Sequence, residues 1–366
     1  MLLVVLSHPH NGWSMVKFSE MLRSFIDPSL RNVNFVSPTN WFSKKIPNRT
    51  MKSFANYFEK KILFPLFLPF YAKKIGARYI LLSDHSDAQL TIFVHGCVRI
   101  VICHDLFAIQ AMLGDIPNIE QSLREKIELR VNFSMLKKSN LIIAVSESTA
   151  KNVKQYLPMV PVDVLPLTVT KVSREISHEY LEDVYTFGQF CLLPMNSHWR
   201  KNRIEGIQAW SEIRKVSPET DLQLVIIGNQ LDGQESDFLK ESGDLAQLHI
   251  RSNVPEEYLS ILYQKCEFVV FTSRYEGFGL PIIESNSHGK LTLHSDLGIL
   301  NEIAGPYNVK LQRSLKDNDW LTVWENLCSR ERRQEALNYY NDTYSNMNFE
   351  ASLENILRNA MNGEKK

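Results

Sequence analysis

Short runs rich in Val, Ile and Leu alternate with longer helix-like segments, and this alternation constrains the fold more than any other feature. Such runs fit strands that are buried on both faces of a parallel sheet. In the first half we expect strands at 2–6, 33–37, 78–82, 91–95, 99–103, 141–145 and 162–167. In the second half we expect them at 189–193, 222–227, 247–250, 267–271, 290–294 and 308–311. Two series of alternating strands and helices predict an α/β protein with two Rossmann-like domains.

Helix signals lie between these runs. From 119 to 135 apolar residues recur every four positions among charged ones, which predicts a helix. Ser146 is expected to cap a further helix that runs toward Gln155.

The length of 366 residues also fits two domains, at roughly 100–200 residues each. The segment 168–187 is polar and lacks a strand pattern, so we place the boundary there. We expect an N-terminal domain over 1–170, a C-terminal domain over 185–342 and a terminal helix over 343–366. That helix carries apolar residues on one face. They are Phe349, Leu353, Ile356 and Leu357.

The composition is that of a globular protein, with 44% hydrophobic and 22% charged residues. No apolar run reaches the roughly 18 residues that a membrane-spanning helix needs. The N-terminus lacks the basic segment and the cleavage site of a secretory signal. The five cysteines are odd in number and include no CxxC pair, which favours reduced thiols. We therefore expect a cytoplasmic protein without a nucleic-acid partner.

A loop with two glycines follows the expected strand at 267–271. Its sequence is SRYEGFGLP, and Pro281 opens the next helix. Such a loop directs backbone N–H groups and the helix dipole toward an anion. Glu276 stands just before the glycines and Glu284 lies one turn into the helix. Two carboxylates would repel a bare phosphate, so we interpret them as acceptors for hydroxyl groups on either side of it.

The spacing Glu276-x7-Glu284 within SRYEGFGLPIIES resembles the signature of retaining GT-B glycosyltransferases of glycosyltransferase family 4, also called glycosyl transferases group 1. The resemblance extends over 255–305. It implies two Rossmann-like domains facing across a cleft, with a C-terminal helix that crosses back to the first. It also implies that Glu276 binds hydroxyls of the transferred sugar and Glu284 the ribose of the nucleotide. Loop amides bind sugar and phosphate, here those of Gly277, Phe278, Gly279 and Leu280.

The segment after the strand at 189–193 resembles the Lys-Asn element of this family. The resemblance implies that Lys201 neutralises the diphosphate of the nucleotide, with Asn202 following it. The family often has an arginine five residues before this lysine, where this chain has Asn196. Arg200 is our candidate for the second cation. The alternative is a solvated basic helix start.

The first half carries further elements of the family. His104 follows the strand at 99–103, and the resemblance implies that it reaches the donor sugar; the alternative is a structural histidine. Gly12 stands where the family has a glycine-rich loop against the donor phosphate. Polar residues at strand ends are candidates for the acceptor side. They are Asp84, His85, Asp87 and Asp105.

These elements predict a retaining glycosyltransferase that uses a nucleotide diphosphate sugar, with GDP-mannose or a UDP-sugar favoured. The acceptor is a hydroxyl, in surface polysaccharide or glycan synthesis. We expect His104, Lys201 and Glu276 to carry catalysis without a metal or other cofactor. Two alternatives stay open. One is a metal-dependent hydrolase that uses the N-terminal His/Asp cluster with His8 and His10. The other is a catalytically silent GT-B subunit that acts as a scaffold.

Residues 41–75 combine eight Lys/Arg with one acid, Glu59, and many aromatics. Residues 1–170 as a whole carry 20 Lys+Arg and 12 Asp+Glu. One interpretation is an interfacial element that contacts an anionic membrane beside a lipid-linked glycan acceptor. The other is an ordinary helix that covers the sheet and points its lysines outward. Pro65 and Pro69 argue against one long membrane-lying helix in this segment.

Overall fold

The computed structural model describes residues 1–7, 13–29, 32–38, 42–116, 119–169, 177–217 and 221–362. The chain divides into two compact units. Unit 1 comprises Met1–Pro166 and Phe349–Lys366, and unit 2 comprises Leu167–Asn348. Each unit is built on its own sheet and is considered by itself.

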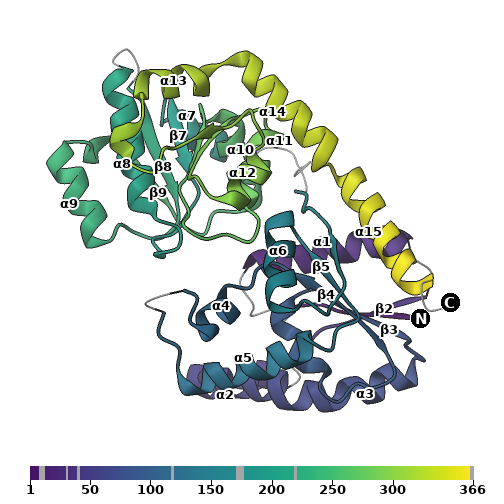
Figure 1. Cartoon of the computed structure of the whole chain (residues 1–366). Helices are drawn as coiled ribbons and strands as arrows, with labels where there is room; N and C mark the ends of the chain where they lie inside the picture. Colours follow the sequence, from purple (N-terminus) through teal and green to yellow (C-terminus); the bar gives the residue numbers. More distant parts are fainter. Residues whose placement is uncertain are drawn as a thin grey trace. The chain divides into compact units, whose positions relative to one another are not determined.

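The sheet of unit 1 has six parallel strands in the order β2-β1-β3-β4-β5-β6 (Figure 1). Strands β1, β3 and β5 are buried along their whole length, which is why their sequences are unbroken apolar runs. The bounds of the six strands are β1 Leu2–Val5, β2 Val33–Val36, β3 Tyr79–Leu82, β4 Val98–Cys103, β5 Leu141–Ala144 and β6 Val162–Val164.

The strand expected at 91–95 is wrong. Residues His85–Thr91 form a 3-10 helix, η3, and β3 pairs directly with β4, with Leu81 opposite Ile100. The sheet therefore has no place for a further strand between these two. Leu90 and Val94 are nevertheless buried, so this apolar run fills the core without joining the sheet.

Helices α1 (Trp13–Ser29), α4 (Phe107–Leu113), α5 (Leu123–Leu136) and α6 (Glu147–Tyr156) connect these strands. Helix α5 begins with a capping box, in which the side chains of Ser122 and Glu125 each accept from the other residue's backbone N–H. Ser146 caps α6 as predicted, because its hydroxyl accepts from the N–H of Thr149 at 3.0 Å.

The basic, aromatic segment forms a 3-10 turn, η1 (Ser43–Lys45), and then one uninterrupted helix. This helix consists of α2 (Arg49–Phe58), a π-helical turn η2 (Glu59–Leu63) and α3 (Phe64–Lys74). Pro65 lies in the first turn of α3 and Pro69 inside it. The prolines therefore do not prevent one long helix, contrary to the expectation. The π-helical turn before Pro65 is the kind of local irregularity that lets a helix continue.

The predicted terminal helix is α15 (Asn346–Asn362), and from Phe349 onward it belongs to unit 1. The rings of Phe25 and Phe349 lie 5.2 Å apart, and the Tyr79 hydroxyl donates to the carbonyl oxygen of Met361 at 2.8 Å. Leu353 and Leu357 are buried. The amphipathic face recognised in the sequence thus packs on unit 1.

Unit 2 repeats the plan with the strand order β12-β11-β10-β7-β8-β9, again all parallel. The strands are β7 Phe190–Leu193, β8 Gln223–Ile227, β9 Leu248–Arg251, β10 Val269–Phe271, β11 Thr292–His294 and β12 Val309–Lys310. The six strands expected in the second half are all present: five have shorter bounds, and β9 is shifted by one residue toward the C-terminus.

The helices of unit 2 cover both faces of this sheet (Figure 1). Helix α8 buries Trp210, whose indole N–H donates to the carbonyl of Leu222 at 3.2 Å. Arg203 of α8 is fully buried and bonds Glu235 through two nitrogens, so its charge is neutralised inside the unit. The bounds are α7 His178–Tyr185, α8 Arg203–Val216, α9 Gly233–Ser242, η4 Leu245–Gln247, α10 Glu256–Lys265, α11 Leu280–Ser287, α12 Gly298–Ala304, η5 Leu315–Asp317, α13 Trp320–Cys328 and α14 Arg330–Thr343.

Each sheet has a point at which the strand order reverses. In unit 1 the chain continues from β1 to β2 on one side and to β3 on the other. In unit 2 the reversal lies between β7 and β10. Ligands of such sheets bind beyond the carboxyl ends of the strands at this reversal. The loops after β1, β3, β7 and β10 are therefore where a site is expected. Among the described residues, none of the helices combines the length and apolarity needed to cross a membrane.

Candidate active site

The reversal in unit 2 brings Lys201 and Glu276 together across 75 residues of sequence. Lys201 lies in the loop after β7 and Glu276 in the loop after β10. The Lys201 ammonium donates to Oε1 of Glu276 at 2.6 Å, and the Ser273 hydroxyl donates to the same oxygen at 2.7 Å. Both charged side chains are half-buried. The pair is thus partly shielded from water and still open to a ligand.

Bonds between the two loops hold this pair in place. The N–H of Arg274 donates to the carbonyl of Arg200 at 2.7 Å, and the Thr272 hydroxyl donates to the carbonyl of Asn202 at 3.0 Å. Asn202 has a left-handed backbone with φ of 52°, a conformation that asparagine tolerates better than most residues. It turns the chain into α8 directly after Lys201.

The glycine loop reaches α11 through Gly279, which requires a residue without a side chain. Its φ is +108°, and a Cβ at this position would lie 2.9 Å from Cδ2 of Leu300. Phe278 before it is buried, while Gly277 and Leu280 are half-buried. The loop therefore turns sharply into the N-terminus of α11, where backbone N–H groups lack partners within the helix.

Glu284 lies in α11 and is held by a tyrosine from another helix. The hydroxyl of Tyr263 in α10 donates to Oε2 of Glu284 at 2.6 Å. Burial, together with the Glu284 carboxylate, raises the pKa of Tyr263, so the hydroxyl keeps its proton and remains a donor. The imidazole of His288 stacks on the Tyr263 ring at 5.8 Å, and Nε2 of His288 lies 3.1 Å from the Ser260 hydroxyl.

Tyr263 is the residue that sequence reasoning missed. Its spacing in α10 marks it as a core side chain, and its ring is indeed buried. No local pattern shows that the hydroxyl ends on Glu284, because the two residues come from different helices.

Asn196, which replaces the arginine of the family pattern, helps to shape the loop after β7. Its side-chain oxygen accepts from the N–H of His198 at 3.1 Å. The N–H of Lys201 in turn donates to the carbonyl of His198 at 2.8 Å. Arg200 is half-buried beside Lys201 and remains the candidate for a second cation.

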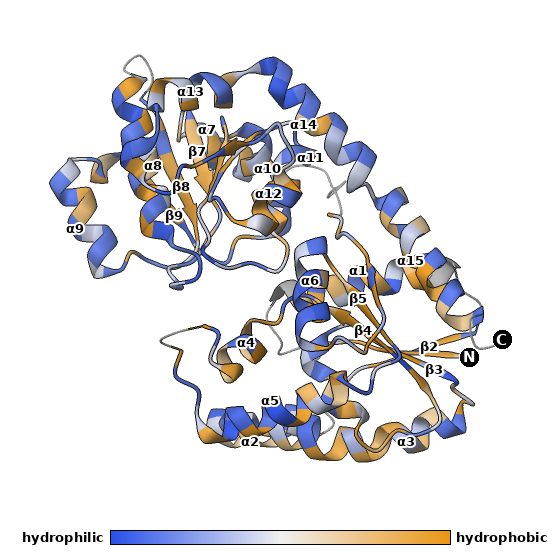
Figure 2. Ribbon diagram, viewed as in Figure 1, coloured by the Kyte–Doolittle hydropathy of each residue, from blue (hydrophilic) through white to orange (hydrophobic). Residues whose placement is uncertain are grey.

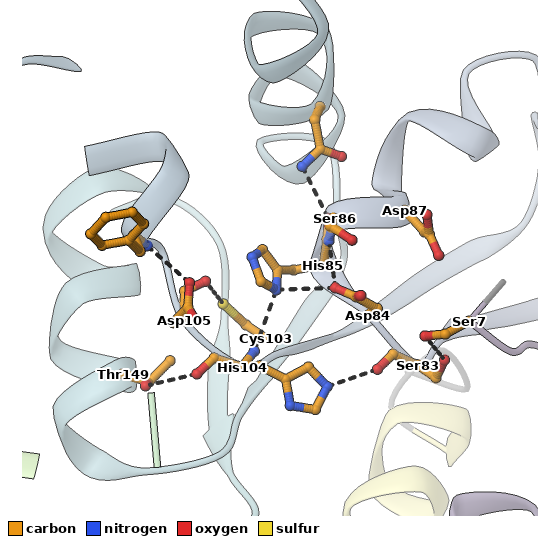
Figure 3. Close-up of polar contacts among 12 residues, drawn as sticks. Ser7, Ser83, Asp84, His85, Ser86, Asp87, Cys103, His104, Asp105 and Thr149 are labelled. Atoms are coloured by element: carbon orange, nitrogen blue, oxygen red, sulfur yellow. Dashed lines mark hydrogen bonds and ion pairs between the residues drawn. The ribbon is translucent and has the colours of Figure 1, made fainter. Parts of the chain in front are cut away.

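In unit 1, His104 lies just beyond the carboxyl end of β4 (Figure 3). Its Nε2 is 3.0 Å from the carbonyl oxygen of Ser83 after β3, and its ring packs edge-on against Phe18 at 4.7 Å. Burial lowers the pKa of His104, although nearby Asp84 opposes this, so the ring is neutral at pH 7. A carbonyl oxygen only accepts, so Nε2 carries the proton and Nδ1 has the lone pair.

The acceptor-side candidates lie around this histidine, and the structure distinguishes among them. Asp84 is buried next to His85, with 3.4 Å between Oδ1 and Nδ1 (Figure 3). Burial acts to raise the pKa of Asp84, but His85, His104 and the N–H of Ser86 outweigh it and the pKa is lowered. The aspartate therefore stays ionised.

Asp105 and Asp87 make structural contacts. Oδ1 of Asp105 accepts from the N–H of Phe107 at 3.0 Å. Asp87 is buried and pairs with the ammonium of Lys60 at 2.8 Å. Burial raises the pKa of Asp87, which the Lys60 charge opposes. Of the four candidates, Asp87 therefore has a structural role, because its ion pair with Lys60 joins η3 to η2.

Gly12, His8 and His10 lie outside the described residues. Within the described parts of the chain, no group of three or more His, Cys, Asp or Glu side chains could hold a metal ion.

Residues 196–320, which contain both Lys201 and Glu276, match the family described as Glycosyl transferases group 1. The serotype-specific mannosyltransferase WbdA of Escherichia coli is 27% identical over 225 residues, which are 56% of this chain and 26% of that protein. A GDP-mannose:cellobiosyl-diphosphopolyprenol alpha-mannosyltransferase of Xanthomonas oryzae pv. oryzae is 35% identical over 78 residues, or 20% of each chain. The chain thus spans about a quarter of the length of WbdA.

Solved structures show the fold over the whole chain. HepE of Anabaena has a TM-score of 0.70 at 12% identity and covers 98% of this chain and 99% of its own. WaaG, a glycosyltransferase of lipopolysaccharide biosynthesis, has a TM-score of 0.66 at 12% identity and covers 97% and 99%. Two Rossmann-like units of this topology define the GT-B fold of glycosyltransferases. The segment that matches the model of glycosyl transferases group 1 lies within unit 2, and the fold of both units is that of GT-B glycosyltransferases.

Proposed function

We propose that this protein is a retaining glycosyltransferase that transfers a mannosyl residue from GDP-mannose to a hydroxyl of a glycan acceptor. The match of residues 196–320 to glycosyl transferases group 1 supports a nucleotide sugar as donor. The names of several relatives support mannose, and one of them includes GDP-mannose. The name of another, the O-antigen chain mannosyltransferase B of Escherichia coli, supports a role in polysaccharide synthesis.

The contact between Lys201 and Glu276 is the observation that carries this proposal. It places a cation and a carboxylate side by side at the strand-order reversal of a nucleotide-binding type of sheet. A nucleotide diphosphate sugar has complementary groups in the same order, a diphosphate next to a hydroxyl-bearing ring. On binding, Lys201 pairs with the diphosphate. Glu276 then accepts from a sugar hydroxyl through Oε2, the oxygen opposite its bonds to Lys201 and Ser273.

Catalysis in this proposal comes from stabilising the leaving group. As the bond to the sugar breaks, negative charge grows on the diphosphate and the sugar carbon gains oxocarbenium character. Lys201, Arg200 and the amides of 277–280 stabilise that charge. Glu284, oriented by Tyr263, holds the ribose, so that the donor is fixed at both ends.

For His104 we propose contact with the transferred sugar, with Nδ1 as the acceptor because Nε2–H is bound to Ser83. Asp84, His85 and Asp105 are proposed to face the acceptor, which is a glycan. A glycan carried on a lipid fits the relative whose substrate is a diphosphopolyprenol. No metal is needed in this scheme, because side-chain cations and amides meet the diphosphate.

The donor is tested by the melting temperature of the protein with GDP, UDP, ADP and dTDP, since a bound ligand raises apparent stability. We expect GDP to give the largest shift and GDP-mannose to be consumed in the presence of acceptor glycans. Activity is expected to survive EDTA. Activity that is lost on chelation and restored by zinc or manganese would instead support the hydrolase alternative.

The site is tested with Glu276→Ala and Lys201→Ala, each of which should lower transfer by roughly tenfold or more, the loss of one charge-assisted hydrogen bond. Lys215→Ala is the matched control, because this lysine lies in α8 and is exposed. Near-normal kinetics in both folded site variants would remove the assignment.

A further inference from the structure

An apolar stripe is exposed along the helix that runs from Arg49 to Lys74. Phe54 and Phe70 are 72% and 75% exposed, near opposite ends of this helix. Phe67 is 37% exposed as well, and six further exposed apolar residues follow one another at intervals of three or four. They are Met51, Phe54, Phe58, Ile62, Leu66 and Phe70. Ala55, Leu68 and Ala72 on another face of the helix are buried. The helix therefore covers the sheet with one face and presents aromatics to solvent on another.

Helix α5 adds a second stripe next to the first. Leu123, Ile127 and Val131 are exposed at intervals of four residues. The two helices are in contact, because the Tyr57 hydroxyl donates to Glu128 at 2.7 Å and the Arg124 guanidinium lies 3.9 Å from the centre of the Tyr57 ring. Figure 2 shows apolar and polar residues interspersed along α2 and α5 and a mostly apolar α3. We call the exposed residues of α2, η2, α3 and α5 the outer helical surface.

The charge beside the apolar stripe is almost entirely positive. Five cations are exposed at the two ends of the segment, namely Lys44, Lys45, Arg49, Lys73 and Lys74. The one acid between 42 and 75, Glu59, is buried and accepts from the hydroxyl of Ser43 at 2.7 Å. The described residues 42–75 thus expose no carboxylate, whereas α5 carries charges of both signs.

We propose that the outer helical surface of unit 1 binds the surface of an anionic phospholipid bilayer. Exposed aromatic and aliphatic side chains flanked by Lys and Arg are the composition that inserts shallowly between lipid headgroups. The cations are attracted to anionic lipids, and the apolar stripe gains by leaving water. An exposed apolar stripe of this length is unusual for a surface that stays in water.

Charge complementarity favours a membrane over a second copy of the chain. A two-fold contact through this surface would bring the same five cations of each copy toward each other. Anionic headgroups offer the opposite sign along the whole segment. This inference rests on the proposed function and deepens it. A membrane-bound unit 1 lies beside an acceptor that is carried on a lipid.

The test is flotation of the full chain with vesicles of phosphatidylcholine and with vesicles that also contain phosphatidylglycerol. We expect the protein to float only with the anionic vesicles. Raising the salt from about 0.1 M to about 1 M should release much of it, because screening shortens the range of the attraction from about 10 Å to about 3 Å. Equal recovery with both kinds of vesicle, or with neither, overturns the proposal.

Two pairs of variants test the surface itself. Lys73→Glu with Lys74→Glu should lower partitioning by roughly tenfold or more. Lys151→Glu with Lys154→Glu makes the same charge change on α6 and should leave it unaltered. Phe54→Ser with Phe70→Ser should also release the protein, whereas Met159→Ser, another exposed position of unit 1, should not. Circular dichroism checks that each variant is folded. Wild-type binding by both variants of the outer helical surface contradicts the proposal.

Two further measurements distinguish membrane binding from dimerisation, and a failure of the membrane proposal from a failure of the proposed function. Light scattering detects a second copy as occupant: a dimer that Phe54→Ser with Phe70→Ser dissociates, without vesicle binding, overturns the membrane proposal. The melting shift with GDP and UDP is measured on the same variants. A protein that binds a nucleotide but no vesicles disproves the membrane surface alone. A protein that binds vesicles but none of the nucleotides disproves the proposed function alone.

Discussion

Among single side chains, Tyr263 shows how a buried residue positions one that meets the ligand. Its hydroxyl ends on Oε2 of Glu284, the proposed ribose ligand, and the stacked His288 ring restrains its own ring. Tyr263→Phe keeps the packing and removes this one bond. We expect KM for the donor to rise by roughly tenfold, since a hydrogen bond to a charged group contributes about 1.5–3 kcal/mol. The kcat of saturated enzyme should change less.

Steady-state kinetics with varied donor measure this split. Tyr180→Phe is the control, because that tyrosine is also in unit 2 but packs against Tyr258, away from Glu284. A fall in kcat at unchanged KM would contradict a positioning role.

From His294, at the end of β11, we predict how the stability of unit 2 changes at acid pH. Burial lowers the pKa of His294 to about 4, and its Nδ1 lies 3.0 Å from the carbonyl oxygen of Ser295. In the unfolded chain a histidine titrates near 6.5. Between these values the unfolded state binds a proton that the folded state does not. The stability contributed by the neutral ring is therefore complete above about pH 6.5 and is lost as the pH falls toward about 4, by up to about 3 kcal/mol.

In His294→Asn the free energy of unfolding should fall less at acid pH, because an amide can donate in place of Nδ1–H and does not titrate. Urea unfolding at several pH values, followed by tryptophan fluorescence, measures it, and Trp210 of unit 2 is a buried reporter. The exposed His178 provides the control, as His178→Asn. The same pH dependence in His294→Asn as in wild type would contradict this account.

At the scale of secondary-structure elements, the junction between the glycine loop and α11 depends on one backbone conformation. Gly279 has a φ of +108° and no room for a Cβ beside Leu300. Gly279→Ala should destabilise unit 2 by about 1–3 kcal/mol, the cost of such a strained conformation, and weaken nucleotide binding. Gly298→Ala is matched to it, because a Cβ at Gly298 meets nothing within 4 Å. Melting with and without GDP compares the two, and equal effects would show that the loop tolerates a side chain.

At the scale of the whole molecule, α15 belongs to unit 1 from Phe349 onward, although it follows unit 2 in the sequence. Leu357 is fully buried there. Leu357→Ala should destabilise unit 1 by about 2–5 kcal/mol, as cavity-forming core substitutions do. Hydrogen exchange at the amides of β1 and β3 should then speed up, while exchange at β7 and β8 stays unchanged. Asn359→Ala, at an exposed position of the part of this helix that belongs to unit 1, is the control. Faster exchange in both units alike would contradict an independent unit 1.

The sequence by itself predicted the two series of strands, the helix at 119–135, the cap of α6 and the terminal helix, because each depends on local periodicity or on a short contiguous pattern. The prediction of a strand at 91–95 was wrong, because β3 and β4 pair directly and leave no place between them for this buried apolar run. Only the tertiary structure decided that Lys201 meets Glu276, that Tyr263 holds Glu284 and that Asp87 is committed to Lys60. It also decided which apolar residues of 51–70 remain in solvent. Periodicity tells which side chains share a face of a helix. Whether another element covers that face depends on contacts between residues far apart in the chain.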